Sequence, residues 1–393
     1  MAKIKKIRPT WLEVNLDHLA DNLKEIRRVT DQGARICAVV KADAYGHGAP
    51  VAAKTLVENG ADFLAVATLS EALQIRKTGI AAPLLILGYT PTDQVKELIL
   101  NNIRQTVFSY EQARLLSETA GKMNRKAVIH IKINTGMARL GFELFRGYEK
   151  TLTEIREIFH LPHIFVEGVF SHLATADETD KSFSELQFRR FNTFIESLEK
   201  HTGKVPIKHI SNSAATVDLP HMNLDMVRVG IIMYGMLTSK YVRKDVLSLK
   251  PAAELKSTVV DLRELPGDVG VSYNHTYRTE GNRRIITIPI GFGDGFPRKL
   301  SGKTGVYFAG RSLPVVGNIC MDHCMADATG VDINIGDEVT IYSNGLYKDI
   351  TIDRIAEKAN TINTEILTSI SKRVPRVYLK NSQVIKIRDD LLD

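Results

Sequence analysis

A repeated alternation of short apolar runs and helical patterns constrains the fold of this chain more than any other feature of its sequence. Eight apolar runs, each suited to a buried strand, occur within about 200 residues, and helical patterns of about a dozen residues separate them. This count favours a closed (β/α)8 barrel over an open doubly wound sheet. The eight runs are residues 37–40, 63–66, 84–87, 105–108, 127–133, 164–172, 207–211 and 226–232.

The pattern changes near residue 250, beyond which short strands and tight turns predominate. A length of 393 residues is enough for two hydrophobic cores. We therefore predict an N-terminal (β/α)8 TIM-type barrel over residues 1–245, followed by a mostly antiparallel β domain over residues 246–393. The strands predicted in the second domain are residues 253–264, 269–273, 284–290, 304–309, 313–316, 337–343 and 374–379.

The composition argues against several classes of protein. An apolar share of 44% and a charged share of 25% are typical of globular proteins, and no apolar run is long enough to span a membrane. The net charge of +7 is spread along the chain without interleaved aromatic residues, which argues against a nucleic-acid partner. The start of the chain lacks the apolar core of a signal peptide, and three cysteines form no disulfide framework. We therefore predict a cytoplasmic protein.

Two short motifs carry little weight. The glycines of 291–295 follow a strand in a β-rich region, so they do not match a dinucleotide-binding fingerprint. The stretch from Cys320 to Cys324 contains two thiols and His323, but no second ligand pair occurs elsewhere in the sequence. We therefore predict no metal site.

Polar residues at the carboxyl ends of the predicted barrel strands are candidates for an active site, because these ends meet at one mouth of a barrel. Lys41 directly follows the apolar run 37–40, where burial would lower the pKa of its amine and make it a usable nucleophile or base. A surface lysine after a strand is the alternative. The candidates at strand ends are Lys41, Arg139, His172, Ser213 and Arg228.

Lys132 lies inside the fifth predicted strand, where strand alternation places it opposite the isoleucines and therefore toward the barrel interior. A buried ammonium there would repel Arg139, so its role needs explanation. A lysine that extends to solvent is the alternative. His172, taken alone, is as well explained by a satisfied core histidine.

The segment from His209 to Thr216 places small polar residues where a strand meets a helix, and such a helix start suits a phosphate group. An ordinary helix cap is the competing interpretation. Gly230 ends the eighth predicted strand, where a glycine permits close approach of a ligand to the backbone.

Several of these motifs resemble those of one enzyme family. Residues 38–48 read AVVKADAYGHG, which resembles the AVVKANAYGHG pattern around the cofactor lysine of the alanine racemases, fold-type III pyridoxal-phosphate enzymes. Residues 132–141 and 288–295 resemble two further motifs of the family, and the resemblance covers nearly the whole chain. It implies a barrel followed by a β domain, as the strand pattern does.

The resemblance also implies an activity. Such an enzyme interconverts L-alanine and D-alanine by a two-base mechanism and supplies D-alanine for peptidoglycan, with Lys41 and Tyr273 as the catalytic bases. Tyr273 would come from the other subunit of a homodimer. Arg139 and the backbone of Met321 would hold the substrate carboxylate, and Lys132 would be a carbamate that orients Arg139. The residues implied to bind pyridoxal 5′-phosphate are Lys41, Tyr45, His172, Asn212, Ser213, Arg228, Gly230 and Ile231.

The sequence departs from the family pattern at a few positions. Asp43 stands where the family has asparagine, and Asn134 stands where aspartate is usual. Phe292 lacks a hydroxyl that is often found at the substrate entrance, and Lys372 stands where some members have tyrosine. A broad-specificity amino-acid racemase of the same fold is therefore one alternative. A non-catalytic pyridoxal-phosphate-binding regulatory protein is another, although such relatives lack the β domain.

Overall fold

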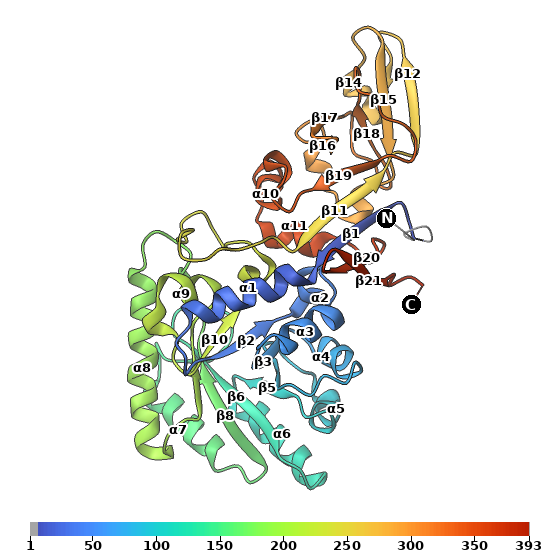
Figure 1. Ribbon diagram of the computed structural model, residues 1–393. Helices are drawn as coiled ribbons and strands as arrows, with labels where there is room; N and C mark the ends of the chain where they lie inside the picture. The colour runs from blue at the N-terminus through green and yellow to red at the C-terminus, as the bar shows by residue number, and fades with distance from the viewer. Residues whose placement is uncertain (1–6, 393) are drawn as a thin grey trace. The chain divides into compact units, whose positions relative to one another are not determined.

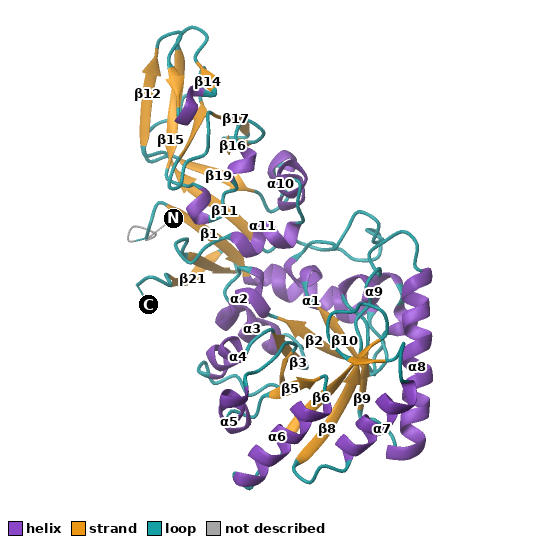
Figure 2. Ribbon diagram, turned by 180° about the vertical axis from the view of Figure 1, so that it is seen from behind, coloured by secondary structure: helices purple, strands orange, loops and turns teal. Residues whose placement is uncertain are grey.

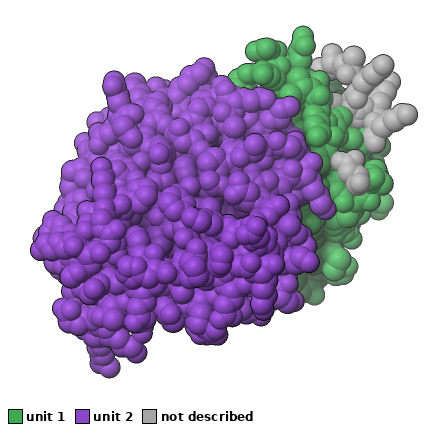
Figure 3. All heavy atoms as spheres, turned by 90° about the horizontal axis from the view of Figure 1, so that it is seen from below, with its two compact units in different colours: residues 1–19, 45–48, 250–393 green, residues 20–44, 49–249 purple. Residues whose placement is uncertain are grey.

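The computed structural model describes residues 7–392, which form two compact units (Figure 3). One unit contains Ala20–Ala44 and Ala49–Leu249. The other contains the described residues up to Leu19, the short segment Tyr45–Gly48 and the described residues from Lys250 onward. These units are defined by contacts within the structure. The predicted domain limits, 1–245 and 246–393, remain a proposal.

The first unit is a barrel of parallel strands with helices on its outside (Figures 1 and 2). Its strands follow the order β10-β2-β3-β4-β5-β6-β8-β9, and backbone hydrogen bonds from Asp225 N to Lys208 O and from Arg228 N to Ser211 O bring β10 back beside β9. The barrel is therefore nearly closed, which confirms the predicted fold class. Its strands are β2 (Arg35–Val39), β3 (Phe63–Val66), β4 (Leu84–Ile86), β5 (Arg104–Val107), β6 (Ala127–Asn134), β8 (Ile164–Phe170), β9 (Ile207–His209) and β10 (Met226–Val229).

Helices follow the strands as the sequence pattern predicts. Some of them begin at ordinary capping signals: Thr68 and Glu71 form a capping box at α4, and the hydroxyl of Ser109 accepts a hydrogen bond from Gln112 N at α6. The helices of this part of the chain are α1 (Leu16–Val29), α2 (Lys41–Tyr45), α3 (Ala49–Glu58), α4 (Leu69–Arg76), α5 (Val95–Leu100), α6 (Tyr110–Lys122), α7 (Tyr148–Phe159), α8 (Ser182–Thr202) and α9 (Ser213–Asp218).

The second unit is built on a ten-stranded sheet of order β12-β15-β18-β17-β16-β19-β11-β1-β20-β21. All neighbouring pairs are antiparallel except β1 with β20. The mostly antiparallel character predicted for the C-terminal part is therefore confirmed. The strands that follow β1 are β11 (Ala253–Thr258), β12 (Asp261–Leu265), β15 (Arg283–Ile288), β16 (Gly305–Phe308), β17 (Arg311–Val316), β18 (Cys324–Asp327), β19 (Glu338–Tyr342), β20 (Arg376–Lys380) and β21 (Gln383–Arg388).

Strand β1 (Thr10–Asn15) joins this second sheet, although the sequence analysis placed it with the barrel. It pairs antiparallel with β11 and parallel with β20. The hydroxyls of Thr10 and Ser257, 247 residues apart, form a buried hydrogen bond of 2.7 Å between the two strands. Local patterns do not show which distant strand a given strand will pair with, so this placement could not be read from the sequence.

Smaller elements complete the second unit. A short hairpin of β13 (Gly270–Val271) and β14 (Tyr277–Arg278) carries the segment around Tyr273, and α10 (Ile352–Ala359) and α11 (Asn363–Ser369) lie between β19 and β20 in the chain. Across residues 7–392, no helix has both the length and the apolar character needed to cross a membrane.

Candidate active site

Lys41 begins a left-handed turn at the carboxyl end of β2. The four residues after it, Ala42 to Tyr45, all have positive φ between 51° and 55°, a conformation that costs non-glycine residues energy. Two carboxylates hold this turn: Oε1 of Glu71 accepts a hydrogen bond from Ala42 N at 2.7 Å, and Oδ1 of Asp43 accepts one from Ala49 N at 2.7 Å. The turn therefore fixes the lysine where the strand ends.

The amine of Lys41 is in a partly buried and electropositive position. Burial lowers its pKa first, the charge of Arg139 lowers it further, and Glu71 opposes this only in part. A larger fraction of the amine is therefore neutral at neutral pH than for a surface lysine. The direction of this pKa shift is the one expected from burial, and the role of Lys41 as nucleophile or base stays a prediction.

Lys132 lies on β6 and is 5% exposed, so its side chain does not extend to solvent and that alternative is wrong. Its Nζ lies 5.5 Å from the centre of the Phe170 ring. Burial lowers the pKa of Lys132 to about 8, with further lowering by Arg139, Arg228 and Lys41. Arg139 itself is exposed in the loop after β6. Cations therefore gather at this mouth of the barrel.

Arg228 is buried on β10 and is the most extensively hydrogen-bonded of the predicted residues. Its Nη1 donates to Nδ1 of His209 at 2.8 Å, and its Nη2 donates to Nδ1 of His172 at 3.1 Å. The carbonyls of Ser171 and Ile210 also accept hydrogen bonds from Nη2, at 2.8 and 3.1 Å. Burial lowers the pKa of Arg228 to about 10. The guanidinium is thus fixed in position by residues at the carboxyl ends of β8 and β9.

A chain of buried side chains continues from Arg228 through the barrel interior. Because arginine only donates hydrogen bonds, Nδ1 of His209 must accept, and its Nε2–H then donates to Nδ1 of His130 at 2.9 Å. Nε2–H of His130 in turn donates to Glu167 at 3.0 Å. Burial lowers the pKa values of both histidines, so both are neutral and each has one fixed tautomer.

Glu167 anchors the far end of this chain. It accepts hydrogen bonds from Nε and Nη2 of Arg104 at 3.1 and 3.2 Å. Burial alone would raise its pKa, but the hydrogen bonds from His130 and Arg104 outweigh burial and lower the pKa of Glu167 to about 2. Gly168 makes room for the chain, since a Cβ there would lie 2.6 Å from Nδ1 of His130.

His172 takes part as an acceptor rather than as a charged group. Burial, followed by the charges of Arg228, Arg139, Lys132 and Lys41, lowers its pKa well below the ordinary value. The sequence analysis left open a simple core histidine. Its hydrogen bond from Arg228 and its four cationic neighbours place it in the candidate site instead.

The predicted phosphate segment has a defined geometry. Asn212 is the N-cap of α9, and its Oδ1 accepts from Ala215 N at 3.0 Å, as the helix-cap alternative predicts. The buried hydroxyl of Ser213 accepts a hydrogen bond from Gly230 N at 2.8 Å. Gly230 and Ile231 follow β10 directly, so this bond joins the start of α9 to the end of β10.

The departure at Asn134 has a structural explanation. Its Oδ1 accepts hydrogen bonds from Gly136 N and Ala138 N, and its Nδ2 donates to Glu143 at 3.0 Å. An aspartate could accept the first two bonds but could not donate the third. Asn134 therefore shapes the loop that carries Arg139.

Tyr45, Tyr273 and Met321 belong to the second unit. Burial raises the pKa of the Tyr45 phenol to about 12. Tyr273 is 66% exposed and Met321 is 55% exposed. Tyr273 does not end a strand, as the sequence analysis expected, but begins a short 3-10 turn, because Ser272 before it has φ of +65° and stops the extended chain. Lys372, which stands where some family members have tyrosine, is exposed.

The sequence analysis missed His209 and Glu167 as members of the site. Strand alternation did place His130 on the same face as Lys132, and His209 stood in the predicted phosphate segment. The connection between them depends on the stagger of β6, β8 and β9 within the barrel, which the sequence does not reveal.

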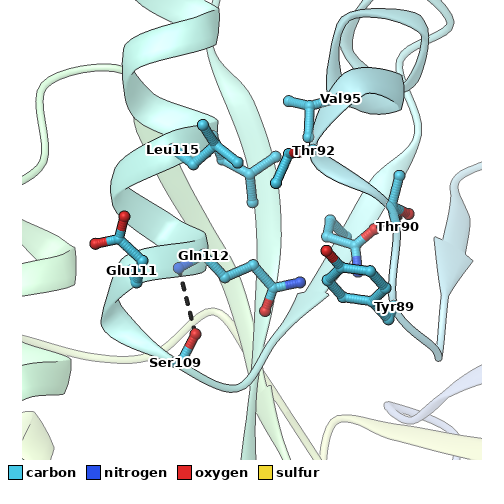
Figure 4. Close-up of a pocket in the computed structure, with 10 residues that line it drawn as sticks. Tyr89, Thr90, Thr92, Val95, Ser109, Glu111, Gln112 and Leu115 are labelled. Carbon is cyan, nitrogen blue, oxygen red and sulfur yellow. Dashed lines mark hydrogen bonds between the residues drawn. The ribbon is translucent and has the colours of Figure 1, made fainter.

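A separate pocket of about 340 Å³ lies between α5 and α6 (Figure 4). Tyr89 and Thr90 line one side, and Gln112 and Leu115 of α6 line the other. None of the predicted site residues lines it, so this pocket is not the candidate active site.

The fold and the site together define an enzyme class: a barrel with a reactive lysine at the end of one strand and a buried arginine at the end of another. Two family models match the chain, "Alanine racemase, N-terminal domain" over residues 14–238 and "Alanine racemase, C-terminal domain" over residues 252–378. The chain belongs to the alanine racemase family, whose enzymes depend on pyridoxal phosphate. The match beyond residue 250 argues against the single-domain regulatory alternative.

Individual relatives resemble the chain over its whole length. An alanine racemase of Clostridium perfringens (strain SM101 / Type A) is 48% identical over 386 residues, 98% of each chain. The solved alanine racemase of Clostridium difficile 630 is 42% identical, with a TM-score of 0.94 over 99% of this chain and 100% of that one. The structure of the Bacillus anthracis alanine racemase with bound L-Ala-P is 35% identical, with a TM-score of 0.90 over 98% and 99%.

Proposed function

We propose that this chain interconverts L-alanine and D-alanine, with Lys41 and Tyr273 exchanging the α-proton on opposite faces of the substrate. One observation carries the proposal most directly: a lysine amine of lowered pKa shares the barrel mouth with the buried, fully oriented guanidinium of Arg228. An amine can accept a proton only in its neutral form, which the surroundings of Lys41 favour, and it returns that proton from its ammonium form.

The residues present fit pyridoxal 5′-phosphate. Nη1 and Nη2 of Arg228 are occupied by protein acceptors, whereas residues 7–392 offer no acceptor to its Nε. Nε can therefore donate to the ring nitrogen of the cofactor and, because arginine stays protonated, leave that nitrogen unprotonated. When bound, the cofactor draws electrons from the substrate α-carbon and acidifies its hydrogen.

We assign the cofactor phosphate to Tyr45, Asn212, Ser213, Gly230 and Ile231. The hydrogen bond between the Ser213 hydroxyl and Gly230 N supports this assignment, because it holds two backbone segments of small residues together. Lys41 would hold the cofactor covalently, and His172 would keep Arg228 oriented through its own hydrogen bond.

We assign the substrate carboxylate to Arg139 and the backbone of Met321, with Lys132 as a carbamate that orients Arg139. Three cations, Arg139, Arg228 and Lys41, lower the pKa of Lys132, and no described carboxylate is among the groups that shift it. A pKa of about 8 leaves a larger fraction of this amine neutral than in an ordinary lysine, and only a neutral amine adds to carbon dioxide, with loss of one proton. The resulting anion would pair with Arg139 rather than repel it.

We further propose a homodimer in which Tyr273 of one subunit serves the active site of the other. Tyr273, Met321 and Phe292 are 66%, 55% and 43% exposed, and large apolar side chains that are so exposed commonly mark an interface. A cytoplasmic location agrees with three free cysteines. Alanine is expected to remain the preferred substrate despite Phe292, because the pocket around the α-carbon and its methyl group sets the limit.

Tyr273→Phe tests the two-base assignment. The variant should keep the visible cofactor spectrum and nearly lose racemisation, since removal of a general acid–base group commonly costs about 10²–10⁴-fold. In heavy water it should still exchange the α-hydrogen of D-alanine through Lys41 and exchange that of L-alanine far more slowly. Equal exchange of both enantiomers would show that one base serves both faces and that Tyr273 only packs.

A further inference from the structure

The backbone around Tyr273 is held in an unusual conformation. Ser272, Asn274 and His275 have φ of +65°, +61° and +46°, three non-glycine residues in the left-handed region within one short turn. Non-glycine residues are strained in this region, and such turns persist only where surrounding contacts hold them. Tyr273 is 66% exposed, so packing of its own side chain does not supply these contacts.

The contacts come from the loop before β18. Nδ2 of Asn318 donates a hydrogen bond to the carbonyl of Tyr273 at 2.8 Å, and the hydroxyl of Ser272 donates to the carbonyl of Asn318 at 2.6 Å. Gly317 allows the two segments to approach, because a Cβ there would lie 2.6 Å from the carbonyl oxygen of Val271. Asn318 is thus bonded both to the carbonyl of Tyr273 and to the side chain of Ser272, the residue before it.

The same loop continues into Met321. The carbonyl of Cys320 accepts a hydrogen bond from Phe292 N at 3.0 Å, and the carbonyl of Met321 accepts one from Gly293 N at 2.9 Å. The loop that fixes Tyr273 therefore also carries the backbone assigned to the substrate carboxylate.

We infer that Asn318 is a positioning residue for Tyr273, which sets the place of the phenol through the backbone without touching the substrate. The inference rests on the proposed role of Tyr273 as the base on the L-alanine face. Asn318 acts on only one of the two bases, because its bonds reach Tyr273 and Ser272 and Lys41 lies in a different unit.

Asn318→Ala and Asn318→Asp test the inference, since neither side chain can donate to the Tyr273 carbonyl. Each should slow α-hydrogen exchange of L-alanine in heavy water by about 10–100-fold, because a displacement of about 1 Å at a catalytic group has effects of that size. Exchange of D-alanine and the cofactor spectrum should change little. Ser301→Ala is the matched control, because the Ser301 hydroxyl accepts from Ile319 N in the same loop without contacting Tyr273.

Tyr273→Phe is measured beside these variants so that the two proposals can fail separately. If Tyr273→Phe slows both enantiomers equally, the assignment of the bases fails. If Tyr273→Phe is selective for L-alanine but Asn318→Asp changes neither exchange rate, the inference about Asn318 is overturned. It is also overturned if Asn318→Asp slows exchange of both enantiomers no more selectively than Ser301→Ala. Selective loss of L-alanine exchange in both Asn318 variants supports it.

Discussion

The predicted site residues are held in two different ways in the two units. Arg228 and Lys132, in the barrel, are 4% and 5% exposed and lie on strands, and Arg228 is oriented by side-chain hydrogen bonds. Tyr273 and Met321, in the second unit, are more than half exposed and lie in loops that are held through hydrogen bonds to their backbone carbonyls. The barrel residues are fixed by contacts within their own unit, whereas the loop residues are exposed groups whose surroundings the proposed dimer would complete.

This contrast separates two kinds of defect. Changes in the barrel should alter how the cofactor is held and the electronic properties of its ring. The reason is that the series of hydrogen-bonded side chains that starts at Glu167 ends at Arg228. Changes in the loops should leave the cofactor in place and alter proton exchange. The variants that follow test whether cofactor binding and proton exchange can be disturbed separately, and they are given in order of decreasing expected effect.

Lys41→Ala should have the largest effect. It removes the covalent attachment and one proton carrier together, so racemisation should fall by at least about 10⁴-fold. The purified variant should lack the absorbance near ~420 nm and should not be labelled after borohydride reduction. Lys24→Ala, on an exposed lysine of α1, is the control. Labelling that persists in Lys41→Ala would place the reactive amine elsewhere.

Lys132→Ala should lower activity by about 10²-fold, because Arg139 loses the anion that orients it. A small carboxylic acid in solution should restore part of the activity of the variant. ¹³C NMR with labelled carbon dioxide should show a carbamate signal in the chain that retains Lys132 and no such signal in Lys132→Ala. The signal should grow as the pH rises through about 8, the pKa of Lys132, since the neutral amine is the form that reacts. Absence of both rescue and signal would leave Lys132 as an unmodified buried lysine.

Glu167→Gln should have a moderate effect that reaches the site only through the histidines. It should destabilise the fold by about 1.5–3 kcal/mol, the usual contribution of hydrogen bonds to charged groups. The pKa of Glu167, about 2, lies below its ordinary value of 4.5, so its stabilisation is present above pH 4.5 and lost as the pH falls toward 2. Denaturant titrations should show a weaker loss of stability over this range in the variant.

The same variant also tests the link to the cofactor. An amide can donate to His130 and reverse the tautomers of His130 and His209, which would leave Nη1 of Arg228 without its acceptor. A shifted cofactor absorbance is therefore expected. If Glu167→Gln lowers the free energy of unfolding but leaves the cofactor absorbance unchanged, His130 and His209 contribute to stability only.

Asn134→Asp should have the smallest effect. The carboxylate keeps the bonds from Gly136 and Ala138 but loses the bond to Glu143 and adds a like charge beside it. A cost of about 1 kcal/mol, seen as a rise in KM of about fivefold, is expected from a loop that places Arg139 less well. An unchanged KM would show that the loop is held by other contacts.

The sequence was sufficient for the barrel and for the lysine at its mouth, because both depend on local signals. Strand alternation placed Lys132 inside the barrel, and an apolar run placed Lys41 at a strand end. The order of partners in the second sheet and the histidine chain depend on pairings between distant strands. The turn at Tyr273 depends on the positive φ of Ser272, and a serine in the sequence does not predict that conformation.

The position of β1 has a consequence for synthesis of the chain. This strand leaves the ribosome first, yet both of its neighbours in the sheet, β11 and β20, are made more than 200 residues later. Contacts so distant in sequence form slowly, and a strand with two unpaired edges is prone to pair with other chains meanwhile. A fragment that starts at residue 246 would lack this central strand and expose the edges of β11 and β20. Completion of the ten-stranded sheet is therefore possible only after nearly the whole polypeptide has been translated.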